Sequence, residues 1–109
     1  MVRVEDFAVA VKALIENKDG KTLLIKRSEL NSHKPFIWEI SGGRLEKGEN
    51  PFEGLKREVK EKTNLSIEIK HPVRIHHFIR EDGQKITMIV FFAKALSGGN
   101  KAKQGAFGV

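Results

Sequence analysis

The chain has 109 residues, a formal net charge of +6 and no cysteine. This length suits a single domain with a buried core. The lack of cysteine excludes disulfides, thiol nucleophiles and cysteine-based metal sites, and it favours a cytoplasmic location. Residues 1–15 hold charged side chains, among them Lys12, within a short apolar run, so we expect no signal peptide and no membrane span.

The positive net charge favours anionic partners, and nucleotides meet this condition as well as nucleic acids do. Tyrosine is absent and the aromatic residues are mostly Phe in apolar runs. The sequence therefore offers no evident platform on which single-stranded bases could stack. Nucleic-acid binding is the weaker interpretation.

A β-hairpin is predicted near the N-terminus. Residues 7–15 are nearly all apolar and predict a buried strand, residues 17–20 predict a turn, and residues 21–26 predict the returning strand. Residues 27–35 then form a polar connection. Arg27, directly after the strand, could contact a phosphate group, although an arginine at a strand end is more often only solvated.

The next strand ends at a pair of glycines. Residues 36–40 are largely apolar, include Trp38, and predict a buried strand. Gly42 and Gly43 follow it and predict a turn. Because glycine has no Cβ, such a pair lets the backbone approach a ligand closely and direct carbonyl groups toward it.

A helix is predicted to begin at about Pro51. Asn50 is a favourable N-cap residue, and proline suits the first helical position. We expect the helix to end near residues 63 and 64, because Asn64 tolerates the left-handed conformation of a C-terminal cap. The three-and-four spacing of apolar residues predicts a buried face made of Phe52, Leu55 and Val59.

Several glutamates are concentrated in and before this helix: Glu46, Glu49, Glu53, Glu58 and Glu61. Like charges held close together repel one another, so a bound divalent cation is the obvious candidate to offset them. Helical geometry places Glu58 and Glu61 on one flank, where both can meet one ion, and Arg57 is spaced to pair with Glu53 and Glu61. The alternative is a solvated acidic face with no ligand.

Residues 66–70, 73–80 and 86–96 predict three further strands, the last two joined by a turn at Asp82 and Gly83. Residues 97–109 have no periodicity and much glycine, and they predict a flexible Gly- and Lys-containing tail. We therefore place the domain at residues 1–96.

The spacing around the helix closely resembles the signature of the Nudix hydrolases. Gly43 is followed after five residues by Glu49, after seven more by the Arg57-Glu58-Val59 triplet, after one more by Glu61, and later by Leu65. Trp38, the glycine pair and the Gly48-Glu49 step resemble the family's usual lead-in. A pattern with so many fixed positions is specific. The resemblance to this family, and to its MutT-like members, covers residues 7–96.

The resemblance implies an α/β fold, the Nudix α/β/α sandwich with a mixed β-sheet. The family's usual last strand and C-terminal helix have no match here, so we expect a shortened C-terminus. It also implies an enzyme that cleaves the diphosphate linkage of a nucleoside diphosphate derivative, such as an NTP, a dNTP or ADP-ribose, by attack of water on phosphorus with Mg²⁺ or Mn²⁺ bound. Hard oxygen ligands suit Mg²⁺, which agrees with this chemistry.

The resemblance also assigns roles to individual residues. The catalytic residues would be Glu58, Glu61 and Arg57, with Glu58 the base in some members. The metal ligands would be Glu58, Glu61 and the Gly42 carbonyl. Gly43 and Glu49 would shape the loop, with Arg57 bracing it against the helix. Candidates for binding substrate are Arg27, Lys62 and Arg44.

The chain departs from the family pattern at three positions. Lys62 stands where a second glutamate is usual, Asn64 where glycine is usual, and Ser41 where proline is common. The first departure matters most, because it changes the local charge by about two units beside the ion site. We expect Lys62 either to weaken catalysis or to reach a substrate phosphate and partly replace a metal.

The sequence leaves two other functions and one question of assembly open. A nucleotide-binding or sensing module with weakened chemistry is the first alternative, and a basic RNA-binding protein is the second. No acidic residue occurs after Asp82, so any catalytic base that relatives draw from that region has no counterpart. A homodimer partner is one way to cover the core that a missing helix would leave exposed.

Overall fold

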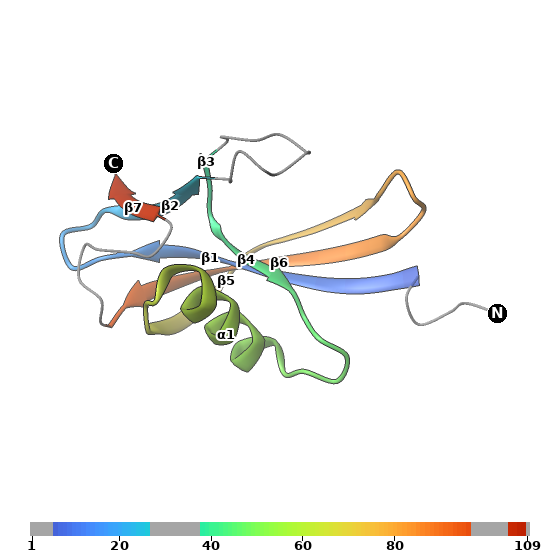
Figure 1. Ribbon diagram of the computed structural model, residues 1–109, viewed down its shortest axis with the longest axis horizontal. Helices are drawn as coiled ribbons and strands as arrows, with labels where there is room; N and C mark the ends of the chain where they lie inside the picture. The colour runs from blue at the N-terminus through green and yellow to red at the C-terminus, as the bar shows by residue number, and fades with distance from the viewer. Residues whose placement is uncertain (1–5, 27–37, 97–104, 109) are drawn as a thin grey trace.

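The computed structural model describes residues 6–26, 38–96 and 105–108. Among these residues no helix has the length and apolar character needed to cross a membrane. The elements, shown in Figure 1, are β1 (Phe7–Glu16), β2 (Thr22–Lys26), β3 (Trp38–Glu39), β4 (Ser41–Arg44), α1 (Pro51–Thr63), β5 (Ile67–Ile79), β6 (Lys85–Ala95) and β7 (Gly105–Gly108).

Strand β1 is the centre of a mixed sheet with the order β3-β2-β1-β6-β5. It runs parallel to β6 from the Phe7↔Lys85 pair to the Glu16↔Lys94 pair. On its other edge it pairs antiparallel with β4 and, at its end, with β2. The remaining pairs are antiparallel, so the predicted mixed β-sheet and α/β class are confirmed.

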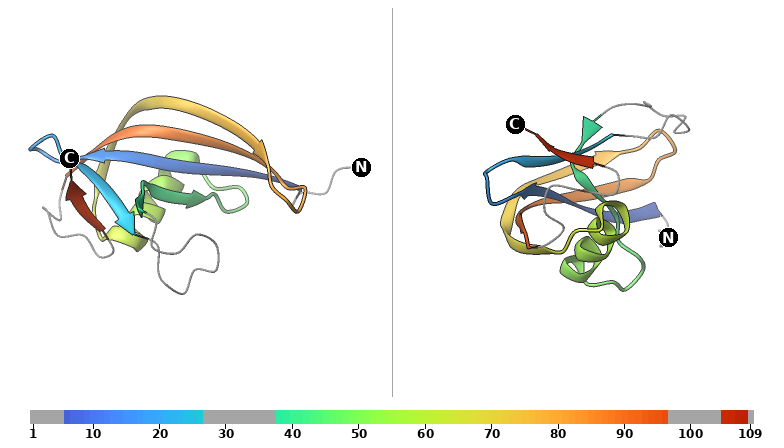
Figure 2. Two further views of the ribbon diagram at one scale, coloured as in Figure 1. Left: turned by 90° about the horizontal axis from the view of Figure 1, so that it is seen from above. Right: turned by 60° about the vertical axis from the view of Figure 1, so that its left-hand side comes forward.

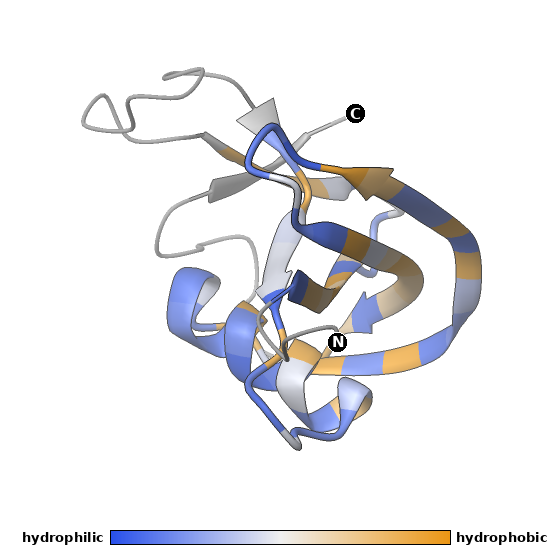
Figure 3. Cartoon of the chain, turned by 90° about the vertical axis from the view of Figure 1, so that its right-hand side faces the viewer, coloured by the Kyte–Doolittle hydropathy of each residue, from blue (hydrophilic) through white to orange (hydrophobic). Residues whose placement is uncertain are grey.

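The core lies between the sheet and α1, which packs against one face of the sheet (Figure 2). Alternate residues of β1 point to one face of the strand, and Val11, Ala13 and Ile15 are buried there. Leu55 and Val59 of α1 are fully buried against them. Figure 3 shows the corresponding alternation of hydrophobic and hydrophilic bands along the strands.

Helix α1 begins and ends where its sequence predicts. The Asn50 side chain accepts hydrogen bonds from the backbone N–H groups of Phe52 and Glu53. At the other end Asn64 has φ 61°, and its N–H donates to the Lys60 carbonyl. The prediction for Phe52 is wrong: at the first turn it is 50% exposed, and its ring only flanks that of Phe91, at 5.5 Å between centroids.

We expect the substitution Asn50→Ala to lower the free energy of unfolding by about 1 kcal/mol, because two backbone donors at the start of α1 lose their acceptor. Urea denaturation followed by circular dichroism measures this loss. Asn50→Asp keeps a capping oxygen and is the matched control, expected to remain within a few tenths of a kcal/mol of the wild type. Equal losses in both variants would show that the cap does not stabilise the helix.

The predicted glycine turn is instead a strand. Gly42 and Gly43 lie in β4, opposite Lys12 and Val11 of β1. A Cβ on Gly42 would lie 2.1 Å from the Val11 carbonyl oxygen, so only glycine permits this close approach of the two strands. The prediction failed because glycine has no side chain that favours a strand. These two residues are extended because they pair with β1.

The C-terminal half also differs from its prediction. The strands predicted over residues 66–70 and 73–80 form one strand, β5, interrupted by irregularities in its pairing with β6 near residues 70 and 73. The prediction of an unstructured tail is wrong for residues 105–108, which form β7 and pair antiparallel with β2. Arg27 and the connection over residues 27–35 lie outside the described residues.

Candidate active site

The site lies where the flank of α1 that carries Glu58 faces β4. A Cβ on Gly43 would lie 2.4 Å from Oε2 of Glu58, so the absence of a side chain at this position makes room for the Glu58 carboxylate against the strand backbone. The Glu58 side chain is only 13% exposed, whereas that of Glu61, one turn further along the helix, is 58% exposed. The two carboxylates therefore lie in different environments on one helix flank.

Arg57 joins these carboxylates to the preceding loop. Its Nε and Nη2 atoms donate to the two carboxylate oxygens of Glu49, at 2.7 and 2.9 Å. Its Nη1 atom lies 3.2 Å from an oxygen of Glu58 and 3.2 Å from an oxygen of Glu61. The two hydrogen bonds to Glu49 fix the plane of the Arg57 guanidinium group. The predicted bracing role of Arg57 and Glu49 thus has a matching geometry.

Two further glutamates lie near this centre in different ways. Glu46 is the more distant partner of Arg57, with 3.9 Å between a carboxylate oxygen and Nη1. Its backbone N–H donates to Glu49 at 2.8 Å, which closes the loop before the helix. Glu53, the other predicted partner of Arg57, lines a neighbouring pocket. The loop partner Glu49 therefore takes the place that helix spacing alone assigned to Glu53.

The contacts around Glu49 shift two pKa values. The hydrogen bonds from Arg57, helped by the Glu46 N–H, lower the pKa of Glu49 from 4.5 to about 2. The same hydrogen bonds raise the pKa of Arg57 above its usual range. Both groups are thus held in their charged forms at neutral pH.

We expect the Glu49–Arg57 pair to contribute stability that depends on pH. Because folding lowers the pKa of Glu49, the contribution is complete above about pH 4.5 and is lost as the pH falls toward about 2. Melting temperatures of the wild type and Glu49→Gln, measured between pH 7 and pH 2, should differ at neutral pH and converge in acid. A difference that stays constant down to pH 2 would contradict this account.

Lys62 contributes its ammonium to the site, although its side chain is 42% exposed. Its ammonium contacts the carbonyl oxygen of Gly42 and lies 3.3 Å from Oε2 of Glu58. The structure therefore brings together seven predicted site residues: Gly42, Gly43, Glu49, Arg57, Glu58, Glu61 and Lys62. Arg44 is exposed at the end of β4, where it pairs with Ala10 of β1.

The oxygen donors of the site fit a divalent cation of the Mg²⁺ type. Glu58 and Glu61 supply carboxylate oxygens on one flank, each within reach of the same Arg57 nitrogen. Within the described parts of the chain no group of three or more His, Cys, Asp or Glu side chains could hold a metal ion. Two carboxylates suit Mg²⁺, which takes its remaining ligands from water and substrate phosphates. The residues thus fit a cation bound jointly with substrate.

One residue beside the site was not predicted. Lys12 of β1 lies opposite Gly42, and its ammonium lies 3.6 Å from a carboxylate oxygen of Glu39. Its side chain is 22% exposed, and its positive charge is paired with Glu39. The signal available in the sequence was a lysine that interrupts an otherwise apolar strand.

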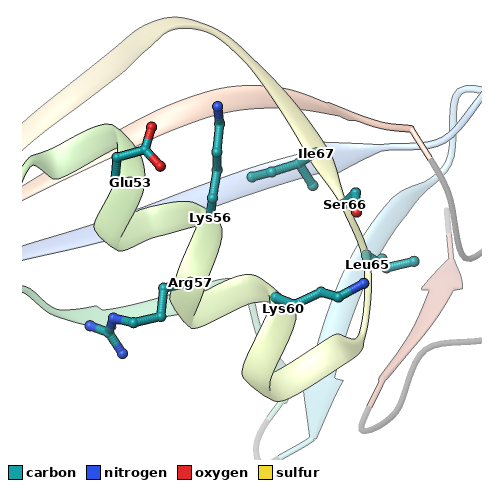
Figure 4. Close-up of a pocket in the computed structure, with 7 residues that line it drawn as sticks. All are labelled: Glu53, Lys56, Arg57, Lys60, Leu65, Ser66 and Ile67. Carbon is teal, nitrogen blue, oxygen red and sulfur yellow. The ribbon is translucent and has the colours of Figure 1, made fainter.

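A pocket of about 340 Å³ lies along α1, beside the start of β5 (Figure 4). Arg57 is the predicted site residue that lines it. Figure 4 shows that the Arg57 and Lys60 side chains leave the helix in different directions, with Lys60 directed toward the end of α1. The pocket is lined by Glu53, Lys56, Arg57, Lys60, Leu65, Ser66 and Ile67.

The chain is similar in sequence to proteins that are named as nucleotide pyrophosphatases. Over 107 residues the chain is 36% identical to the ADP-ribose pyrophosphatase of Methanocaldococcus jannaschii, covering 92% of this chain and 60% of that protein. It is 32% identical over 68 residues to the CTP pyrophosphohydrolase of Escherichia coli, covering 62% and 50% of the two chains. The chain thus spans three fifths or less of the length of these curated relatives.

Solved structures agree in fold. The crystal structure of a MutT protein from Methanosarcina mazei matches with a TM-score of 0.76 and 26% identity, covering 99% of this chain and 76% of that chain. Residues 6–106 match the NUDIX domain family, so the match passes residue 96 and includes part of β7. This extent corrects the predicted end of the resemblance. The chain belongs to the Nudix family.

Proposed function

We propose that this chain is a hydrolase that cleaves the diphosphate linkage of a nucleoside diphosphate derivative and depends on Mg²⁺ or Mn²⁺. The observation that carries the proposal is the convergence of Glu58 and Glu61 on one Arg57 nitrogen, held in place by Glu49. Named relatives act on ADP-ribose and CTP, which share a nucleoside joined to a diphosphate. Hydrolysis breaks one P–O bond of this linkage and adds water across it.

Each residue has a task in this reaction. Glu58 and Glu61 would hold the cation, and a bound cation would supply charge neutralisation at the phosphate oxygens. Arg57 holds both carboxylates in position through its contact with Glu49. The Lys62 ammonium lies beside Glu58 and can face a phosphate oxygen. Arg44, which is exposed at the end of β4, and Arg27 remain candidates for binding substrate.

The proposal is tested with a panel of nucleoside triphosphates, ADP-ribose and dinucleoside polyphosphates, each with Mg²⁺ or Mn²⁺. Release of phosphate, pyrophosphate or nucleoside monophosphate is measured by chromatography. We expect turnover of at least one class of substrate and its loss when EDTA is added. No turnover of any substrate, with nucleotides still bound, would overturn the hydrolase proposal.

A nucleotide-binding or sensing module is the second candidate. The observation that favours it is the contact of Lys62 with both the Gly42 carbonyl and Glu58, which occupies two groups assigned to the metal. Binding measured by calorimetry, without turnover in the panel, is its expected result. An RNA-binding protein would instead show affinity for a polymer that falls steeply with salt, because counterions are released on binding.

A further inference from the structure

Two of the three groups assigned to the metal face a cation that belongs to the chain itself. The Gly42 carbonyl oxygen and Oε2 of Glu58 both contact the Lys62 ammonium, the latter at 3.3 Å. The other oxygen of Glu58 accepts from Arg57 at 3.2 Å. Both oxygens of this largely buried carboxylate are therefore paired with positive side chains.

The backbone explains why these groups converge. Glu58 and Lys62 are four residues apart, so they are neighbours on the helix surface. Gly43 has no side chain, which lets the Glu58 carboxylate lie against β4 beside the Gly42 carbonyl. A carbonyl oxygen and a carboxylate oxygen directed at one point form a cation site. In this chain the ammonium lies at that point.

We propose that Lys62 is a tethered cation that takes the place of one divalent ion between the Gly42 carbonyl and the Glu58 carboxylate. This inference rests on the proposed function, because it concerns the same site. It assigns the chain one divalent ion fewer than the same site would bind with a carboxylate at position 62. Glu58 and Glu61 would together hold the ion that remains, and the Glu61 side chain is 58% exposed.

The presence of Lys62 in place of a divalent ion also affects the protein when no substrate is bound. A largely buried carboxylate is costly without a partner, and Lys62 supplies that partner whether or not a metal ion is bound. An ammonium has three N–H donors, of which two are directed at Gly42 and Glu58, so the third can face a phosphate oxygen. Lys62 thus provides positive charge to the substrate without a second ion.

The test is the number of Mn²⁺ ions bound per chain, measured by electron paramagnetic resonance and calorimetry on the full chain without nucleotide. We expect Lys62→Glu to bind one ion more than the wild type, because it removes the ammonium and adds a carboxylate beside the Gly42 carbonyl. Lys62→Arg keeps a cation at this position and should bind the wild-type number.

Lys60→Glu is the matched control, because it makes the same change in charge on the same helix. The Lys60 ammonium lies 3.5 Å from the Asn64 carbonyl oxygen, and its side chain is directed toward the end of α1 (Figure 4). We expect no additional ion in this variant. An additional ion in Lys60→Glu would show that net charge, and not the position of Lys62, determines the stoichiometry, and would overturn the proposal.

A second variant keeps the test decisive if Lys62→Glu does not fold. Lys62→Met removes the ammonium without adding a charge, and it should bind one further Mn²⁺ ion more weakly than Lys62→Glu does. A stoichiometry unchanged in both folded variants would overturn the proposal. Because this readout needs no turnover, a gain of one ion with no hydrolysis would reject the hydrolase function alone, and hydrolysis with no gain would reject the role of Lys62 alone.

Discussion

Replacing Glu58 by Gln is expected to lower the metal-dependent kcat/KM by at least about 100-fold. The substitution keeps the size of the side chain and its contact with the backbone of β4. It removes the negative charge that a cation needs, at a position where the side chain is only 13% exposed and solvent cannot replace it. Steady-state kinetics on the best substrate of the panel measures the loss.

Glu68→Gln is the matched control for this prediction. Glu68 lies on β5, is exposed, and pairs with Lys70 at 2.8 Å, away from the groups that contact Arg57. Its removal changes the net charge by the same amount, and we expect kcat/KM within about twofold of the wild type, as for a surface substitution outside the site. Turnover of Glu58→Gln within tenfold of the wild type would show that this carboxylate does not bind the essential cation.

Gly42→Ala is expected to lower the free energy of unfolding by about 3 kcal/mol, the upper end of the usual cost of overpacking. The added Cβ would meet the Val11 carbonyl oxygen at 2.1 Å and the Lys12 Cα at 2.6 Å. Both atoms belong to the backbone of the central strand, so the clash can be relieved only by moving β4 away from β1. Chemical denaturation measures the effect.

Gly43→Ala tests the neighbouring position with the same added methyl group. Here the nearest atoms belong to the Glu58 carboxylate, at 2.4 to 2.9 Å, and a side chain can move where a strand cannot. We expect a stability loss below about 1 kcal/mol together with a loss of activity comparable to that of Glu58→Gln. Equal destabilisation by both alanine variants would show that the contact of Glu58 with β4 is as rigid as the pairing of β4 with β1.

Local signals explain which parts of the fold were predicted from the sequence. Asn50 and Asn64 set the two ends of α1 through contacts within a few residues, and both contacts are present. The apolar strands β1 and β6 were also evident, because their burial appears as runs of apolar residues. Phe52 was misassigned because periodicity does not reveal how far the core extends under the first turn of a helix.

Contacts between distant segments explain what was missed. The strand β7 has little apolar pattern of its own and exists through its pairing with β2. In the same way, β4 is a strand because it pairs with β1, and a Gly-Gly pair in the sequence does not predict this pairing. Hydrogen bonding to a partner strand stabilises both segments, and pairing across such distances in the chain leaves no local signature.

The sequence by itself determined the helix, its caps, and the line of charged residues from Glu49 to Glu61, because each depends on spacing along one helix or the loop before it. The spacing also identified Glu58 and Glu61 as neighbours. Only the tertiary structure decided which groups of the sheet these helix residues contact. The Lys62 ammonium reaches the Gly42 carbonyl because the packing of α1 on β4 brings together atoms that are 20 residues apart in the chain.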